Sequence, residues 1–335
     1  MFVKNQMLLV PFGLIFLYSL AVPVLSYVIE LGPVNKLLRC PGLYCGRQIL
    51  SNGSWSNCGA CPRGYRTNVS SACIECNDRP EFYDWLYLGF MVLLALVLHW
   101  FSIDTAAKRR SFCKEVLVLH ISALFEIVTA AILTLLMSDP VGSLAVRSCR
   151  TEKLSDWYTL LHNPNPHYDE TLHCTQEAVY PLYTMVFIFY ALSVVLMLLV
   201  RPWLVQHFLP KHGKMSIYAA LYFFPTLALI QAVFGGLIYY SFPYVVIILS
   251  VISNAAHFAF KLDQSMQFLI VNTVTDIRNV VILLGHWLLH AYGIIAITQL
   301  QDPVFHSALV ALVPLPAVFY ILTARFTDPN KLHTD

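Results

Sequence analysis

The sequence predicts an all-α polytopic membrane protein in which seven transmembrane helices follow a small disulfide-rich luminal module. Three observations support this prediction: an apolar composition, a series of long apolar runs, and a cysteine-rich segment ahead of them. Of the 335 residues, 58% are hydrophobic and only 12% are charged, about half the charged fraction of an ordinary globular domain. The net charge of +2 gives no strong positive field and therefore no support for a nucleic-acid partner.

Seven apolar runs have close to the roughly 17 to 25 residues that a helix needs to cross the ~30 Å hydrocarbon core of a bilayer. They lie at 83–101, 115–137, 179–200, 216–240, 244–260, 280–300 and 307–323. Lipid offers no hydrogen bonds to the backbone, so runs of this kind are expected to be helical. Away from their ends they contain a single Asp, Glu, Lys or Arg, which is Glu126. Together they define a transmembrane bundle over 83–323.

Basic residues predict the orientation of the helices, because short cytosolic loops are enriched in lysine and arginine. Such residues follow the first, third, fifth and seventh runs: Lys108, Arg109, Arg110, Arg201, Lys211, Lys214, Lys261, Arg278, Arg325 and Lys331. The short connections at 241–243 and 301–306 contain none. The module at 27–82 and the long connection at 138–178 are therefore expected in the lumen or exterior, and the tail at 324–335 in the cytosol.

The N-terminal stretch from 1 to 26 has the pattern of a signal peptide. Lys4 precedes an apolar run that ends with Val24 and Ser26 before a candidate cleavage site. The run is longer than the usual apolar region of a signal peptide, so an uncleaved anchor with a cytosolic N-terminus is the alternative. Both interpretations place residue 40 onward in the lumen.

The cysteines are expected to form disulfides. Two Cys-x-x-Cys pairs within "CGACPRGYRTNVSSACIEC" have a spacing that fits either zinc or disulfides, and the luminal side favours oxidation. Six cysteines in the module and two in the long connection, both even numbers, are expected on that side, whereas Cys113 lies alone at the cytosolic face. Within the module, crossed pairing is favoured over pairing inside a Cys-x-x-Cys motif, and Cys149 is expected to bond Cys174. The disulfide candidates are Cys40, Cys45, Cys58, Cys61, Cys73, Cys76, Cys149 and Cys174.

Two acceptor motifs for N-glycosylation agree with the luminal position of the module. Asn52-Gly-Ser54 and Asn68-Val-Ser70 are the only Asn-x-Ser/Thr motifs in the chain, and both lie inside the cysteine-rich segment. Their confinement to this segment predicts that Asn52 and Asn68 carry glycans.

Ionisable side chains inside the apolar runs raise a second hypothesis. Glu126, His120, His286 and His290 lie at matching depths on two predicted helices, as ligands of a catalytic metal would in an intramembrane hydrolase. The simpler interpretation is that these groups make hydrogen bonds between helices. We favour the simpler interpretation, because matched depth is easily satisfied and no catalytic Ser or Asp signature accompanies the histidines. No cofactor and no enzymatic activity are therefore expected.

Several motifs resemble those of one known family. They are "CPGLYCGR", "CGACPRGYRTN", "YDWLYLGFM", "LVLHWF", "SDPVG", "RSCR", "LSDWYTLLHNP", "HCTQEAVYPLYT", "SIYAALYFFP", "HWLLHAYGII" and "ALVPLPAVFY". In this order, from about residue 40 to 328, they resemble the Jun N-terminal kinase-associated membrane protein family. The leader at 1–35 and the connection at 261–279 depart from the family pattern.

The resemblance implies a seven-helix adaptor in the endoplasmic reticulum membrane. Such an adaptor recruits the proteasome and ubiquitin ligases to misfolded proteins of this compartment and prolongs signalling by the Jun N-terminal kinase. Kinase and proteasome contacts must lie in the cytosol, so the departure at 261–279 bears directly on whether kinase binding extends to this chain. The intramembrane metal hydrolase remains the alternative function.

Overall fold

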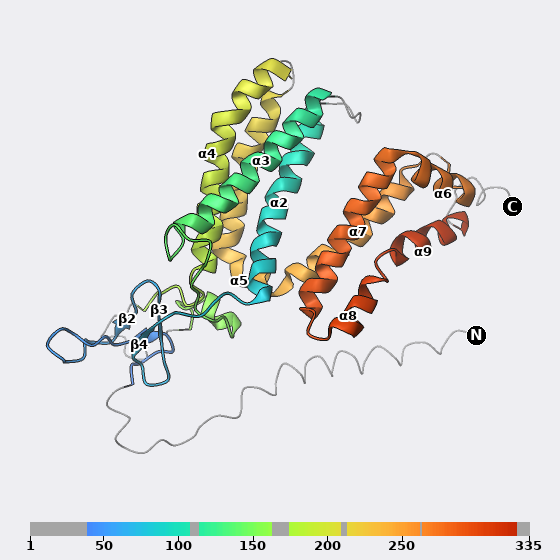
Figure 1. The fold of residues 1–335 in the computed structure, drawn as a ribbon. Coiled ribbons are helices and arrows are strands. Elements are labelled where there is room, and N and C mark those ends of the chain that lie inside the picture. Colours follow the sequence, from blue (N-terminus) through green and yellow to red (C-terminus); the bar gives the residue numbers. More distant parts are fainter. Residues whose placement is uncertain (1–38, 108–113, 163–173, 209–212, 262, 327–335) are drawn as a thin grey trace, which may run out of the picture. The chain divides into compact units, whose positions relative to one another are not determined.

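A computed structural model describes residues 39–107, 114–162, 174–208, 213–261 and 263–326. The expected leader at 1–26, Cys113 and most of the C-terminal tail lie outside these ranges. Within them the chain is mostly helical, as the sequence predicted (Figure 1). The helices are α2 (Phe82–Ala107), α3 (Lys114–Met137), α4 (Leu182–Phe208), α5 (Lys214–Ala259), α6 (Met266–Thr275), α7 (Ile277–Thr298), α8 (Pro303–Val310) and α9 (Leu315–Thr323).

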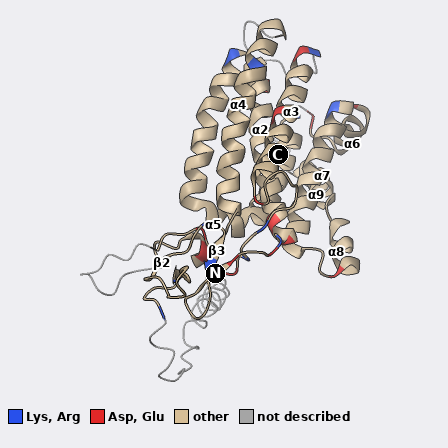
Figure 2. Cartoon of the chain, turned by 60° about the vertical axis from the view of Figure 1, so that its left-hand side comes forward, with Lys and Arg blue, Asp and Glu red and all other residues tan. Residues whose placement is uncertain are grey.

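Six of the described helical stretches are long and apolar enough to cross a membrane. They are α2, α3, α4, α5, α7 and the stretch Pro303–Thr323, which contains α8 and α9. Lys, Arg, Asp and Glu are few along these helices (Figure 2). Such a surface suits lipid, in which an unpaired charge is costly.

The largest difference from the predicted helices lies in α5. The sequence predicts separate runs at 216–240 and 244–260, whereas α5 is one helix of 46 residues that includes the expected loop at 241–243. Pro243 has no backbone N–H, which leaves the carbonyl of Tyr239 without its helical partner. The Tyr83 hydroxyl donates to this carbonyl at 2.8 Å, so α2 satisfies the oxygen and the helix continues.

The helices form two packed groups that share α5. The larger core lies among α2, α3, α4 and the first half of α5, and includes Tyr87, Ile127 and Phe224. The second core lies among the end of α5, α6, α7 and α9, and includes Phe258 and Leu283. The long helix α5 therefore contributes to both cores.

A small region without α-helices, called here the head, consists of residues 39–81, 138–162 and 174–181. It contains two antiparallel strand pairs, β1 (Cys45–Gly46) with β2 (Gly59–Ala60) and β3 (Tyr65–Thr67) with β4 (Cys73–Glu75). It also contains the short 3-10 helix η3 (Leu154–Trp157). These strands are too short to enclose an apolar core, which makes covalent links the natural source of stability.

Candidate functional site

Four disulfides hold the head together. They join Cys40 to Cys58, Cys45 to Cys174, Cys61 to Cys73, and Cys76 to Cys149. Neither Cys-x-x-Cys motif is bonded internally, and all four of their sulfur atoms are used. No thiolate of these two motifs remains to bind zinc, which removes the zinc interpretation.

The predicted pairing of Cys149 with Cys174 is wrong. Cys174 bonds Cys45 and Cys149 bonds Cys76, so the long connection is joined to the cysteine-rich segment instead of being closed on itself. The Cys149 N–H also donates to the Tyr180 carbonyl at 2.7 Å, and the Ser148 N–H to the Asp78 carbonyl at 2.8 Å. The two segments form one unit although 129 residues separate Cys45 from Cys174.

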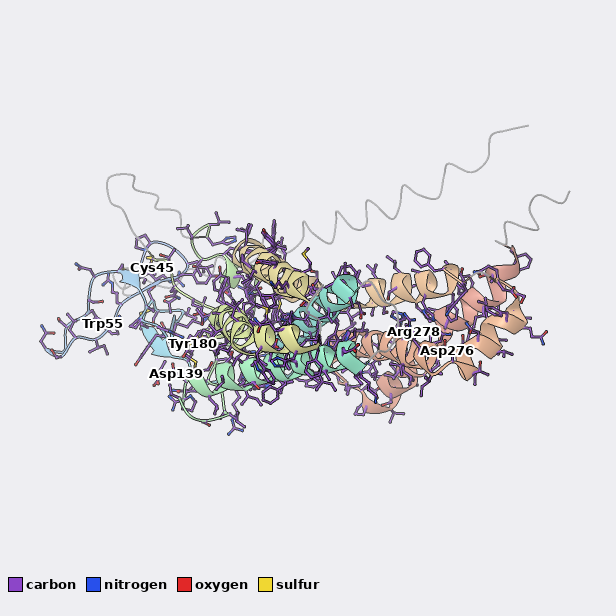
Figure 3. All side chains as sticks on the ribbon, turned by 90° about the horizontal axis from the view of Figure 1, so that it is seen from above. Cys45, Trp55, Asp139, Tyr180, Asp276 and Arg278 are labelled. Carbon is purple, nitrogen blue, oxygen red and sulfur yellow. A yellow bond between two sulfur atoms is a disulfide. The ribbon has the colours of Figure 1, made fainter. Side chains whose placement is uncertain are left out.

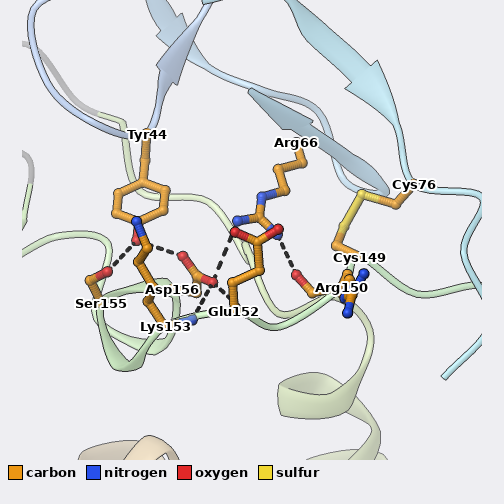
Figure 4. Close-up of polar contacts among 9 residues, drawn as sticks. All are labelled: Tyr44, Arg66, Cys76, Cys149, Arg150, Glu152, Lys153, Ser155 and Asp156. Carbon is orange, nitrogen blue, oxygen red and sulfur yellow. Dashed lines mark hydrogen bonds and ion pairs between the residues drawn. A yellow bond between two sulfur atoms is a disulfide. The ribbon is translucent and has the colours of Figure 1, made fainter. Parts of the chain in front are cut away.

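A buried polar cluster reinforces this union (Figure 4). The Tyr44 hydroxyl donates to Asp156 Oδ1 at 2.7 Å and lies 2.8 Å from Ser155 Oγ. Asp156 Oδ2 accepts from the backbone N–H of Glu152 and of Lys153 and lies 3.4 Å from Arg66. Burial raises the pKa of Tyr44 above its usual range, so its phenol remains a donor to a more alkaline pH than an exposed tyrosine would.

Trp157 connects the head to the helices. It packs with the rings of Tyr87 and Tyr239, at centroid distances of 5.8 and 5.0 Å, and belongs to the larger helical core. Gly236 on α5 provides the space, because a Cβ at this position would lie 2.6 Å from the Trp157 Cβ. The head is therefore packed against α2 and α5 as well as linked to them through the chain.

A buried charge cluster joins α2, α3 and α4. Arg201 lies 2.5 Å from Glu126 Oε2 and 2.9 Å from His99 Nδ1, and Ser122 donates to Glu126 Oε1 at 2.7 Å. The side chains of Arg201 and Glu126 are 0% exposed. The arginine neutralises the carboxylate where neither could remain charged alone at low cost.

Sequence reasoning missed the position of Arg201. It assigned this residue to a cytosolic connection, whereas the structure places it inside α4. The available signal is the apolar sequence on both sides of it, "LMLLV" before and "PWLV" after. If the third predicted helix had been extended to Phe208, Arg201 would have been inside it. Arg201 and Glu126 could then have been predicted to form a pair of opposite charges.

The predicted metal ligands are not brought together. His120 lies 3.3 Å from Asp104, and Glu126 is held by Arg201. His286 and His290 belong to α7, where their Nδ1 atoms lie 3.0 and 3.1 Å from hydroxyl groups of α5. Across the described ranges no three His, Cys, Asp or Glu side chains are close enough to hold a metal ion. Nothing in this arrangement favours the metal hydrolase.

Hydrogen bonds between polar side chains connect the end of α5 to α7. Ser250 contacts His290, Ser253 contacts His286, and Lys261 donates to Asn279 Oδ1 at 2.6 Å. Interhelical hydrogen bonds of this kind, combined with a small residue at the contact, are typical of helix packing in membranes. The small residue here is Gly293, where a Cβ would lie 2.5 Å from Ile247 Cγ1 and 3.1 Å from the Pro243 carbonyl.

This close approach predicts opposite effects for two alanine substitutions on α7. Gly293→Ala will force α5 and α7 apart and lower the free energy of unfolding by about 1–3 kcal/mol. Gly285→Ala meets nothing within 4 Å and will be neutral or stabilising by up to about 1 kcal/mol. Unfolding of both variants in mixed micelles tests this prediction, and equal effects would show that the contact at Gly293 is unimportant.

These features define a class of protein: a helical membrane protein with a disulfide-linked head packed onto its helices. The family model described as JNK1/MAPK8-associated membrane protein matches residues 40–329. The chain therefore belongs to the JNK1/MAPK8-associated membrane protein family, as its motifs indicated.

Curated relatives agree with this assignment. A JNK1/MAPK8-associated membrane protein from Mus musculus is 51% identical over 301 residues, which cover 88% of this chain and 95% of the relative. The Homo sapiens protein of the same description is 52% identical with the same coverage. A Caenorhabditis elegans homolog is 32% identical over 308 residues, covering 86% of this chain and 93% of that protein. No solved structure matches the chain.

Proposed function

We propose that this protein is a non-enzymatic adaptor of the endoplasmic reticulum membrane that recruits ubiquitin ligases and the proteasome to misfolded proteins. The observation that carries the proposal is the membership of the family, because resemblance to this family implies the adaptor role. The structure supports it with a disulfide-linked head packed against a set of apolar helices. Such a protein can connect two compartments without catalysing a reaction.

The proposed orientation places the head in the lumen and the C-terminus in the cytosol. Support comes from the disulfides, which persist in an oxidising compartment, and from the basic residues at the opposite helix ends. Lys114 begins α3 and Lys214 begins α5, whereas the head precedes α2 and joins α3 to α4. The leader at 1–26 is proposed to direct this insertion as a signal peptide or an anchor.

Seven membrane crossings are proposed, with α5 supplying the fourth and fifth. A straight helix of 46 residues would be ~69 Å long, more than twice the hydrocarbon core. The bonds between Tyr83 and the Tyr239 carbonyl, and between Tyr292 and the Leu86 carbonyl, support a return at Pro243. Both contacts lie near the start of α2, beside the head. The second half of α5 would then run back antiparallel to α7.

Glycosylation of the head follows from this orientation. Asn52 is exposed and Asn68 is half-buried, and each side-chain oxygen accepts hydrogen bonds from the serine of its own motif. Removal of N-linked glycans by an endoglycosidase should therefore increase the electrophoretic mobility of the protein. Asn52→Gln and Asn68→Gln should each remove one step of this shift, and the double variant should remove all of it. An unmodified wild-type protein would contradict the luminal position of the head.

The family description also supports a proposed association with the kinase. Relatives are described as associated with JNK1/MAPK8, and we extend this to a contact on the cytosolic side that prolongs signalling by the kinase. The purified protein in nanodiscs should retain added kinase, whereas empty nanodiscs should not. Equal retention by both would remove this part of the proposal.

Degradation of a misfolded luminal protein tests the adaptor function. Cells that lack the adaptor should degrade such a protein more slowly in a translation-arrest chase, and the wild-type chain should restore its half-life. The Cys45→Ser/Cys174→Ser variant, which lacks one of the two disulfides between the segments of the head, should not restore it. An unchanged half-life in the cells that lack the adaptor would contradict the proposed function.

A further inference from the structure

The short helix α6 turns its apolar residues away from the protein. Met266, Ile270 and Val274 are spaced four apart, share one face, and are 42, 48 and 73% exposed. Val271 beside them is 52% exposed, whereas Leu269 is the one buried residue of α6. The outer face of α6 is therefore mainly apolar.

The side of α6 that faces the protein is more polar. Asn272 and Thr273 are half-buried there. The Asn272 carbonyl accepts from Asn279 Nδ2 at 3.1 Å, and the Thr273 hydroxyl donates to the Leu269 carbonyl at 2.6 Å. A helix on a water-exposed surface shows the opposite pattern, with apolar residues inward and charged residues outward. In α6 only Leu269 is a buried apolar residue, and most of the other apolar residues face outward, which departs from the usual pattern.

Its position in the chain limits what can cover this face. α6 lies between α5 and α7, both long and apolar enough to cross a membrane. With 10 residues it is ~15 Å long, about half of a hydrocarbon core, and a run of this length suits an interfacial segment. α6 thus connects two helices whose length and composition suit a membrane.

Charged residues are confined to the two ends of α6. Lys261 and Asp263 precede it, Asp276 and Arg278 follow it, and α6 itself contains no Asp, Glu, Lys or Arg. Figure 3 shows Asp276 and Arg278 at the corner where α6 meets α7. Lys261 bonds Asn279, which in turn bonds Asp276, so this corner is fixed by polar contacts. Such flanks keep both ends of an embedded helix in water.

We infer that α6 lies in the plane of the membrane surface, with its Met266, Ile270 and Val274 face inserted among phospholipid acyl chains. The occupant of this face is lipid, and the connection from α5 to α7 is a membrane anchor instead of a docking loop for cytosolic proteins. The inference depends on α5 and α7 crossing the membrane and is independent of the adaptor function.

Spin labels at single cysteines test the inference in the full-length protein. Cys113→Ser first removes the ninth cysteine, since the other eight are in disulfides. Ile270→Cys and Val274→Cys then place labels on the outer face, and Asp263→Cys provides an exposed control three residues before α6. After reconstitution in phosphatidylcholine vesicles, power saturation compares the accessibility of each label to oxygen and to a water-soluble nickel chelate.

Labels at 270 and 274 should be reached by oxygen far more than by the chelate, and the label at 263 should show the reverse. High chelate accessibility at all three positions would place α6 in water and overturn the inference. Low accessibility to both reagents at 270 and 274, with spin–spin broadening, would identify a second copy as the occupant and would equally overturn it. All three labelled positions are exposed, so the substitutions leave the core unchanged.

Discussion

Replacing Arg201 with methionine will lower the free energy of unfolding of the helical bundle by about 3–5 kcal/mol, the usual cost of breaking a buried ion pair from one side. The substitution leaves the Glu126 carboxylate, 0% exposed, with only Ser122 as a hydrogen-bond partner among its present contacts. It also removes the donor at His99 Nδ1. Unfolding of the purified protein in mixed micelles measures the loss.

A second variant separates the charge from the packing. Arg201→Met combined with Glu126→Met replaces both charges with apolar groups and should recover most of the lost stability, because buried ion pairs are often no better than apolar packing. Recovery is favoured here because Arg201 Nε and His99 Nε2 have no partner among the described residues even in the wild-type chain. A double variant as unstable as Arg201→Met would show that the packing of the arginine matters more than its charge.

The largest effect in the head will come from the disulfide between Cys45 and Cys174. In the chain-entropy model, opening the Cys45–Cys174 loop costs ~4 kcal/mol, because the Cys76–Cys149 bond shortens the path of 129 residues between these cysteines. The Cys61–Cys73 loop of 12 residues contributes ~3 kcal/mol. Cys45→Ser/Cys174→Ser should therefore destabilise the head more than the matched Cys61→Ser/Cys73→Ser. Hydrogen exchange in nanodiscs can measure both, at amides such as Cys76 N–H, which is bonded to the Gly64 carbonyl.

The contrast between the two pairs is the informative result. Equal protection factors in the two variants would mean that the Cys76–Cys149 bond and the polar cluster of Tyr44, Asp156 and Arg66 already hold the long connection in place. Increased exchange across both segments of the head in the Cys45/Cys174 variant alone would show that this disulfide makes them one unit.

The helices could be predicted from the sequence because lipid imposes a simple rule of length and polarity. The rule did not predict that α5 continues through 241–243, since this depends on a hydroxyl of Tyr83 that lies 156 residues away from Tyr239. The pattern of apolar residues within α5 does not indicate that contact.

The oxidised state of the cysteines could also be predicted, but their partners could not. The even number of cysteines and their expected luminal side predicted disulfides. Which cysteines pair, however, depends on which segments fold together. The union of Cys45 with Cys174 is defined by contacts between distant segments, including Tyr44 with Asp156. Arg201 was missed for a related reason, since a positive charge after an apolar run looks like a cytosolic end until a buried carboxylate is placed opposite it.

Crosslinking in intact membranes followed by mass spectrometry tests the adaptor function most directly. Cells that express the wild-type chain would be treated with a membrane-permeant crosslinker, and the peptides joined to this protein would be identified. The proposed function predicts ubiquitin ligases and proteasome subunits joined to its cytosolic segments, and misfolded glycoproteins joined to the head. Recovery of neither ligases nor proteasome subunits would contradict it.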